Sequence, residues 1–217
     1  MQTQTKFANF SFTVDVTWCL EQLLKDGRIT ERDKLLIQTT HRQKDQLKWH
    51  PLQWVGHFNL KDQLNIASTL TVNRLCQWLA EKAEVPLFVI DPLKADVTAL
   101  TSVMSQEFAV RNRILAVEVS VDRILIGTDQ PFITEWQNNL ERSLAPKKIE
   151  RVLLNPEQLQ RYLVEYYQVS RAVNSSQKAS AYDRDHKGVE ALLQLGDTQN
   201  PDANDQHIVK LVDWVLQ

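Results

Sequence analysis

The chain has 217 residues, of which 43% are hydrophobic and 24% are charged, and its formal net charge is −2. This composition is typical of one or two folded domains, and the near-neutral charge does not favour nucleic acid or an anionic membrane as a partner. No uncharged stretch approaches the roughly 20 residues of a membrane-spanning helix, and no signal peptide is present. Two cysteines among apolar neighbours suit a reducing compartment. We therefore expect a cytoplasmic protein without direct membrane insertion.

Residues 1–84 are predicted to form a helical domain. A first apolar stripe at helical spacing ends at Gly27, Thr30 caps a second helix, and Thr69 or Thr71 caps a third. The apolar residues that these helices carry are Val16, Leu20, Leu23, Leu24, Leu35, Leu36, Ile37, Val72, Leu75, Cys76 and Leu79.

A weak internal repeat runs through this domain. The spacing from Leu23 through Gly27 to Thr30 recurs from Leu52 through Gly56 to Asn59. The second copy would then contain an insertion of about a dozen residues around Lys61 to Ser68, ahead of the third helix.

Residues 85–173 alternate strand and helix patterns in the order β-α-β-β-α-β-α. Asp96 caps one helix whose apolar face extends to Phe108. A turn at Asp122 and Arg123 makes a hairpin, and Pro131 opens a second helix. The fold class is therefore α+β: an N-terminal helical domain followed by a small α/β domain, whose helices pack on a small, mostly antiparallel sheet.

The remaining residues divide into two predicted segments. Residues 174–206 are rich in Ser, Asp, Gln and Asn and are predicted to be a flexible acidic linker. Residues 207–217 begin an amphipathic helix with an apolar stripe, which we expect to lead into a further, missing domain. The stripe consists of Ile208, Leu211, Val212 and Val215.

Signatures of catalysis are lacking in this sequence. None of the five glycines stands in a phosphate-binding Gly-x-x-x-x-Gly-Lys-Ser/Thr loop, so no nucleotide triphosphate site is predicted. His41, His50 and His57 lack the helical spacing of a metal site. The cluster from Asp183 to His186 falls in the linker, where no pocket would shift its pKa values. We predict no catalytic, cofactor-binding or metal-binding residue.

Basic residues outnumber acidic ones between Leu24 and Lys48. One interpretation is a solvated helix face, and the other is a basic rim beside aromatic anchors, which suits an acidic protein partner. The tryptophans favour core packing or a partner surface over base stacking. The candidate partner-binding residues are Arg28, Arg32, Lys34, Arg42, Trp49 and Trp54.

Four stretches, in this order, resemble the N-terminal region of the GspE/PulE/PilB ATPases of type II secretion and type IV pilus assembly. They are Leu70 to Asp91, Phe108 to Val119, Ile124 to Pro131, and Asp202 to Asp213. The resemblance implies a regulatory half that lacks the ATPase core. ATP and magnesium would bind only in that missing core.

The resemblance also implies partners. The chain would dock the C-terminal ATPase domain onto the cytoplasmic domain of an inner-membrane assembly protein, which would make it peripheral to that membrane. An alternative is a cyclic-di-GMP sensor, because related proteins bind this dinucleotide through tandem Arg-Leu-Gly segments. Here those positions hold Trp18, Cys19 and Leu20, then Leu47, Lys48 and Trp49, so both arginines are missing. A further alternative is a fragment of an ATP-hydrolysing secretion motor.

Overall fold

The computed structural model describes residues 11–173 and residue 175. The described residues up to Ser170 form one compact unit, from which residues 171–173 and 175 are separate. The predicted linker lies outside the described residues except for Ser175, and the predicted helix over residues 207–217 lies outside them entirely. Within the described part of the chain, no helix is both long enough and apolar enough to cross a membrane.

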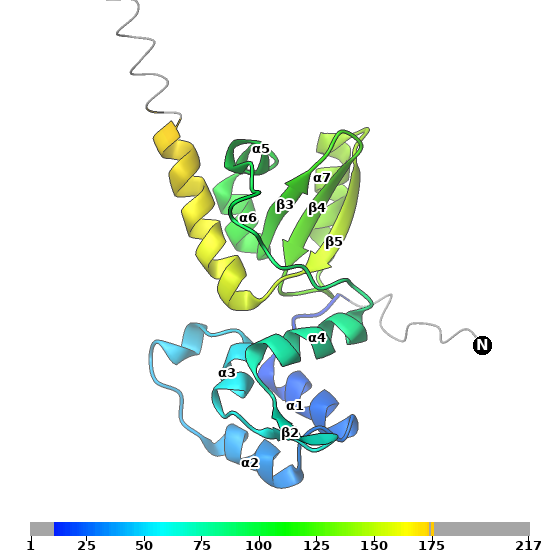
Figure 1. Ribbon diagram of the computed structural model, residues 1–217, viewed down its shortest axis with the longest axis vertical. Helices are drawn as coiled ribbons and strands as arrows, with labels where there is room; N and C mark the ends of the chain where they lie inside the picture. The colour runs from blue at the N-terminus through cyan, green and yellow to red at the C-terminus, as the bar shows by residue number, and fades with distance from the viewer. Residues whose placement is uncertain (1–10, 174, 176–217) are drawn as a thin grey trace, which may run out of the picture. The chain divides into compact units, whose positions relative to one another are not determined.

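The N-terminal residues form helices α1 (Val16–Lys25), α2 (Glu31–Thr39), α3 (Pro51–His57) and α4 (Val72–Ala83), which pack on one another, with a β-hairpin beside them (Figure 1). A short 3₁₀ turn, η1 (Gln46–Lys48), precedes α3. Thr30 and Thr71 cap α2 and α4 as predicted, because their hydroxyls accept free N–H groups of the first turn. Gly27 follows α1 at φ +69°, a left-handed conformation that glycine adopts without strain.

The hairpin of β1 (Lys61–Asp62) and β2 (Asn65–Thr69) occupies the stretch that the repeat marked as an insertion. The strands pair antiparallel through an irregular register. The carboxylate of Asp62 holds the hairpin in place, because it is buried and lies 2.8 Å from the Arg28 guanidinium. The insertion is therefore an ordered element tied to the loop that follows α1.

A first apolar core draws on all four of these helices. Ile37 belongs to this core, but Leu35 and Leu36 on the same helix are 61% and 49% exposed. Because successive residues of an α-helix are turned by about 100°, three consecutive apolar side chains cannot all face one core. The structure therefore leaves two apolar side chains of α2 in solvent.

The C-terminal part contains α5 (Val97–Ser102), α6 (Gln106–Asn112), α7 (Glu135–Leu144) and strands β3 (Ile114–Val119), β4 (Arg123–Thr128) and β5 (Lys148–Leu153) (Figure 1). A further helix covers residues 156–173. The sheet order is β3-β4-β5, with β3 and β4 antiparallel and β4 and β5 parallel. The α+β class is confirmed, but the sheet is not mostly antiparallel as predicted, because one of its strand pairs is parallel. The predicted first strand is reduced to a parallel bridge between Leu87 and Leu153.

Two helix boundaries differ from the prediction. The single helix expected from Asp96 to Phe108 is broken, because the hydroxyl of Ser105 caps a separate helix, α6. Pro131 does not open α7, which begins at Glu135. The residues between them form a turn that sends Phe132 into the first core, where its ring stacks 4.5 Å from that of Phe12.

Gln130, at the end of β4, joins three distant segments. Its side-chain Oε1 accepts the Val14 N–H at 2.7 Å, and its Nε2 donates to the Val14 carbonyl at 3.3 Å. The same Nε2 lies 3.1 Å from Nε2 of His50, whose Nδ1 accepts the Leu52 N–H and caps α3. All of these groups are buried, and desolvation lowers the pKa of His50. The helical part and the α/β part thus share a polar joint, and the predicted boundary at residues 84 and 85 remains a prediction.

An ion pair lies beside this joint. Asp129 has a side chain that is 0% exposed and accepts a bidentate contact from Arg113, which is 42% exposed. The hydrogen bonds from Arg113 to Asp129 raise the pKa of the guanidinium. Arg113 also ends α6 at φ +52°, so its side chain projects from a left-handed residue.

Candidate partner-binding surface

The six predicted partner-binding residues do not form one surface. Arg28 is half-buried, and its guanidinium is paired with the buried Asp62 carboxylate, so it supports the hairpin. Lys34 is half-buried on α2, whereas Arg32 is exposed on the same helix. Only part of the predicted basic rim is therefore available to a partner.

The predicted aromatic anchors also differ in accessibility. Trp54 is only 2% exposed, so it is not the partner-contacting anchor that was predicted, and Trp49 is half-buried. Trp54 packs in a cluster with Trp49, His57 and Phe58, with ring centroids 5.1 to 6.5 Å apart. Trp54 lies on the side of α3 that packs into the first core, so its side chain is held in one orientation. Its role is to support the surface from below.

Arg42 covers the buried Trp54. Its guanidinium carbon lies 4.7 Å from the centroid of the indole ring, a cation–π arrangement. Burial lowers the pKa of Arg42, because desolvation disfavours the charged form. No ion pair joins Arg42 to a carboxylate within residues 11–173. Arg42 is thus a partly desolvated cation held by an aromatic ring.

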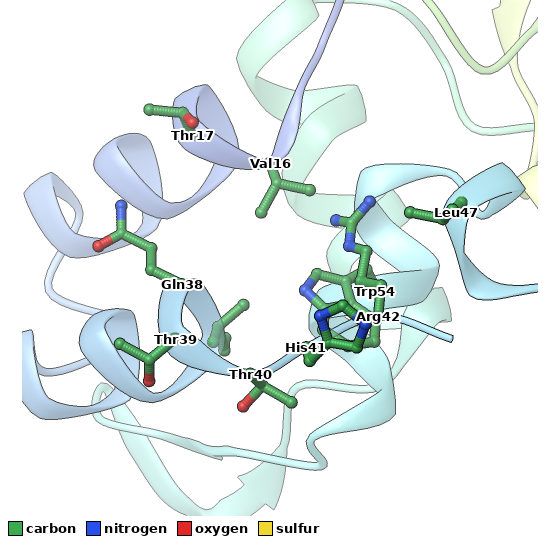
Figure 2. Close-up of a pocket in the computed structure, with 10 residues that line it drawn as sticks. Val16, Thr17, Gln38, Thr39, Thr40, His41, Arg42, Leu47 and Trp54 are labelled. Atoms are coloured by element: carbon green, nitrogen blue, oxygen red, sulfur yellow. The ribbon is translucent and has the colours of Figure 1, made fainter. Parts of the chain in front are cut away.

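A hollow of about 460 Å³ opens beside Arg42, between the start of α1, the end of α2 and α3. Figure 2 shows Val16 reaching into this space, with Gln38 and Thr39 on the α2 side and Arg42, Trp54 and Leu47 on the opposite side. The wall also includes Thr17, Ile37, Thr40 and His41. None of these lining residues carries a carboxylate, and Arg42 is the one arginine among them.

The outward side of α2 continues from this hollow. Arg32, Leu35, Leu36 and Thr39 follow each other at the i, i+3, i+4 and i+7 positions of one helix face, and all four are exposed. We call these four residues the α2 face. Thr39 belongs both to this face and to the wall of the hollow, so the two are continuous. Leu47, across the hollow, is also exposed.

The chemistry of this surface is that of binding. The hydroxyls of Thr39 and Thr40 donate at 2.8 and 2.7 Å to the Leu35 and Leu36 carbonyls, so their own hydrogens are already used. Within the described ranges, no group of three His, Cys, Asp or Glu side chains could hold a metal ion. Apolar side chains, a stacked arginine and a concave wall together suit a polypeptide partner.

The prediction missed Leu35, Leu36 and Leu47 as surface residues. The signal was present for the first two, because three consecutive apolar residues in a helix must include at least one that faces outward. Leu47 had no comparable signal, because it stands in a 3₁₀ turn whose orientation depends on distant packing.

Comparisons with known proteins agree with the resemblance. Residues 83–173 match the MshEN domain family. The chain is 74% identical over 208 residues to the Type IV pilus assembly ATPase TfpB of Acinetobacter baylyi, and the match covers 96% of this chain. The chain spans 36% of the length of that relative.

The chain also matches two solved structures, MshE with cdg and the N-terminal domain of XpsE. The MshE structure is 20% identical with a TM-score of 0.45, and the match covers 69% of this chain and 98% of that one. For XpsE, the identity is 16% and the TM-score 0.39, and the match covers 71% of this chain and 97% of that one.

Proposed function

Since the chain corresponds to the N-terminal region of ATPases of the GspE/PulE/PilB family, we propose that it is the docking and regulatory part of a type IV pilus assembly ATPase. In this role it holds the motor against the cytoplasmic domain of an inner-membrane assembly protein. The chain contributes binding and orientation, and it performs no chemistry of its own.

The observation that carries this proposal is the α2 face. Leu35 and Leu36 are exposed side by side on a helix whose opposite side is packed, and a hollow with an arginine continues from them. Single exposed leucines are ordinary, but adjacent ones beside a concave wall are typical of an interaction site. A protein partner would bury them.

We infer that ATP hydrolysis belongs to residues outside this sequence. The relative from Acinetobacter baylyi is named as an ATPase, and this chain spans 36% of it. The sequence contains no phosphate-binding loop. We therefore propose that ATP and magnesium bind only in the remainder of the protein, and that the inner membrane is reached through the partner.

The test is recruitment of the full-length protein to the inner membrane of cells that assemble pili. We expect Leu35→Ser with Leu36→Ser to shift the protein from the membrane fraction to the soluble fraction and to reduce pilus assembly. Both side chains are substantially exposed, so the fold should survive.

The matched control is Val110→Ser on α6, whose side chain is 53% exposed but lies outside the α2 face. This variant should be recruited like the wild type. Recruitment that survives the double leucine change, with thermal unfolding unaltered, would refute the docking role of this surface.

A further inference from the structure

We propose that the α2 face and the adjoining hollow bind an acidic, amphipathic helical segment of a partner protein, with one of its carboxylates seated on Arg42. This inference rests on the proposed docking function and specifies the chemistry of the partner. The apolar side of the segment would cover Leu35, Leu36 and Leu47, and its acidic side chains would meet Arg32 and Arg42.

The charge of the hollow selects an acid. Arg42 is partly desolvated and stacked on Trp54, and the described residues provide it with no carboxylate partner. The indole of Trp54 covers one side of this guanidinium, while the N–H groups remain able to donate a bidentate contact. Because no lining residue is acidic, nothing in the wall would repel an incoming carboxylate.

The apolar residues select a polypeptide. Leu35 and Leu36 stand one turn from Thr39, and Leu47 borders the hollow from η1. A helix laid across α2 would place residues at i, i+3 and i+4 spacing over these leucines. An amphipathic helix thus satisfies both the apolar and the charged parts of the surface.

Two other occupants fit less well. A membrane would meet Arg42 and Trp54 inside a concave wall, where neither side chain can enter a bilayer. A cyclic dinucleotide carries two phosphates, whereas Arg42 is the single arginine of the wall and Leu35 and Leu36 would remain uncovered.

The experiment measures binding of a labelled synthetic peptide to the 217-residue chain by fluorescence anisotropy. The peptide has Leu at helical i, i+3 and i+4 spacing and Glu elsewhere, and a second peptide replaces every Glu by Lys. We expect the Glu peptide to bind and the Lys peptide to fail. Arg42→Gln should weaken the Glu peptide by about tenfold to a hundredfold, the range of one charge-assisted hydrogen bond.

The matched control is Arg111→Gln. Arg111 also lies over an aromatic ring, at 5.9 Å from that of Phe108, but it is exposed and belongs to α6 in the α/β part. This control should bind the peptide like the wild type. Leu47→Ser, at a residue outside both apolar cores, should also weaken binding, and it supplies a second variant if Arg42→Gln unfolds.

The inference is overturned if folded Arg42→Gln binds the Glu peptide as tightly as the wild type, if Leu47→Ser does so, or if both peptides bind equally. It is also overturned if phosphatidylglycerol vesicles or cyclic di-GMP displace the Glu peptide. If Leu35→Ser with Leu36→Ser abolishes recruitment in cells while Arg42→Gln changes neither recruitment nor peptide binding, the docking function stands and the acidic partner is wrong. Unaltered recruitment of the double leucine variant instead refutes the docking function itself.

Discussion

The ion pair of Arg113 and Asp129 should be asymmetric, so that removing the arginine costs more than removing the carboxylate charge. Arg113→Ala leaves the carboxylate of Asp129 uncompensated at a position that is 0% exposed. Asp129→Asn leaves an arginine that is 42% exposed and able to turn toward water. Both variants keep a Cβ at residue 113, so the strain of its left-handed backbone cancels from the comparison.

The magnitudes follow from these exposures. An unpaired buried charge costs about 3–5 kcal/mol of unfolding free energy, which is the expected effect of Arg113→Ala. Losing charge-assisted hydrogen bonds costs about 1.5–3 kcal/mol, and hydration of the exposed arginine should keep Asp129→Asn near the lower end. The two variants should therefore differ by about 2 kcal/mol.

The assay is urea unfolding of each variant at neutral pH, followed by tryptophan fluorescence. The slopes of unfolding free energy against urea concentration are compared, because equal slopes mean that each variant exposes the same surface area on unfolding. Arg123→Ala serves as the control, because its ion pairs with Glu118 and Glu150 are exposed and should contribute little. If Asp129→Asn is as destabilising as Arg113→Ala, or more so, the reasoning from solvent access is wrong.

Further predictions concern packing, pH and ligand binding. Gly127→Ala should destabilise the fold by about 1–3 kcal/mol, because the new Cβ would lie 2.3 Å from Leu154 Cδ1, and Leu154→Ala in the same chain should recover part of that loss in a double-mutant cycle. Burial lowers the pKa of His50, so the stability that this residue contributes is present above its unfolded pKa of 6.5 and is lost as the pH falls through the lower folded pKa. His50→Asn can still cap α3 but does not titrate in this range. This variant should therefore flatten the decline in unfolding free energy measured between neutral and acid pH. Calorimetry should show weak binding of cyclic di-GMP, because Trp18 and Leu47 stand at the two positions where related proteins have arginines. Losing two charged contacts lowers the affinity by about two to four decades, so a sub-micromolar dissociation constant would contradict this prediction.

Local rules predicted much of the fold. Caps such as Thr30, Thr71 and Asp96 depend on a side chain and the N–H groups that follow within three residues, so the sequence contains both partners. Contacts between residues far apart in the sequence could not be predicted from these local rules. The pairing of Arg28 with Asp62 joins residues 34 positions apart, and only the fold brings them together.

The candidate site shows the same division. The stretch rich in basic residues was visible in the sequence, but counting charges cannot distinguish Arg28, which is paired with a buried acid, from Arg42, which stacks on an indole. The burial of Trp54 depends on which way α3 turns, and that is set by packing against the other helices. The prediction that Pro131 begins a helix was wrong, because proline is favoured in tight turns as well as in the first turn of a helix.

The two hydrogen bonds between Gln130 and the backbone of Val14 determine which substitutions residue 14 can accept during evolution. The amide of Gln130 contacts the N–H and the carbonyl of residue 14, as a neighbouring β-strand would, so these two bonds do not depend on which side chain stands there. Residue 14 can therefore vary among apolar types without releasing the segment that leads into α1. Proline, which has no N–H to donate, is excluded by this contact.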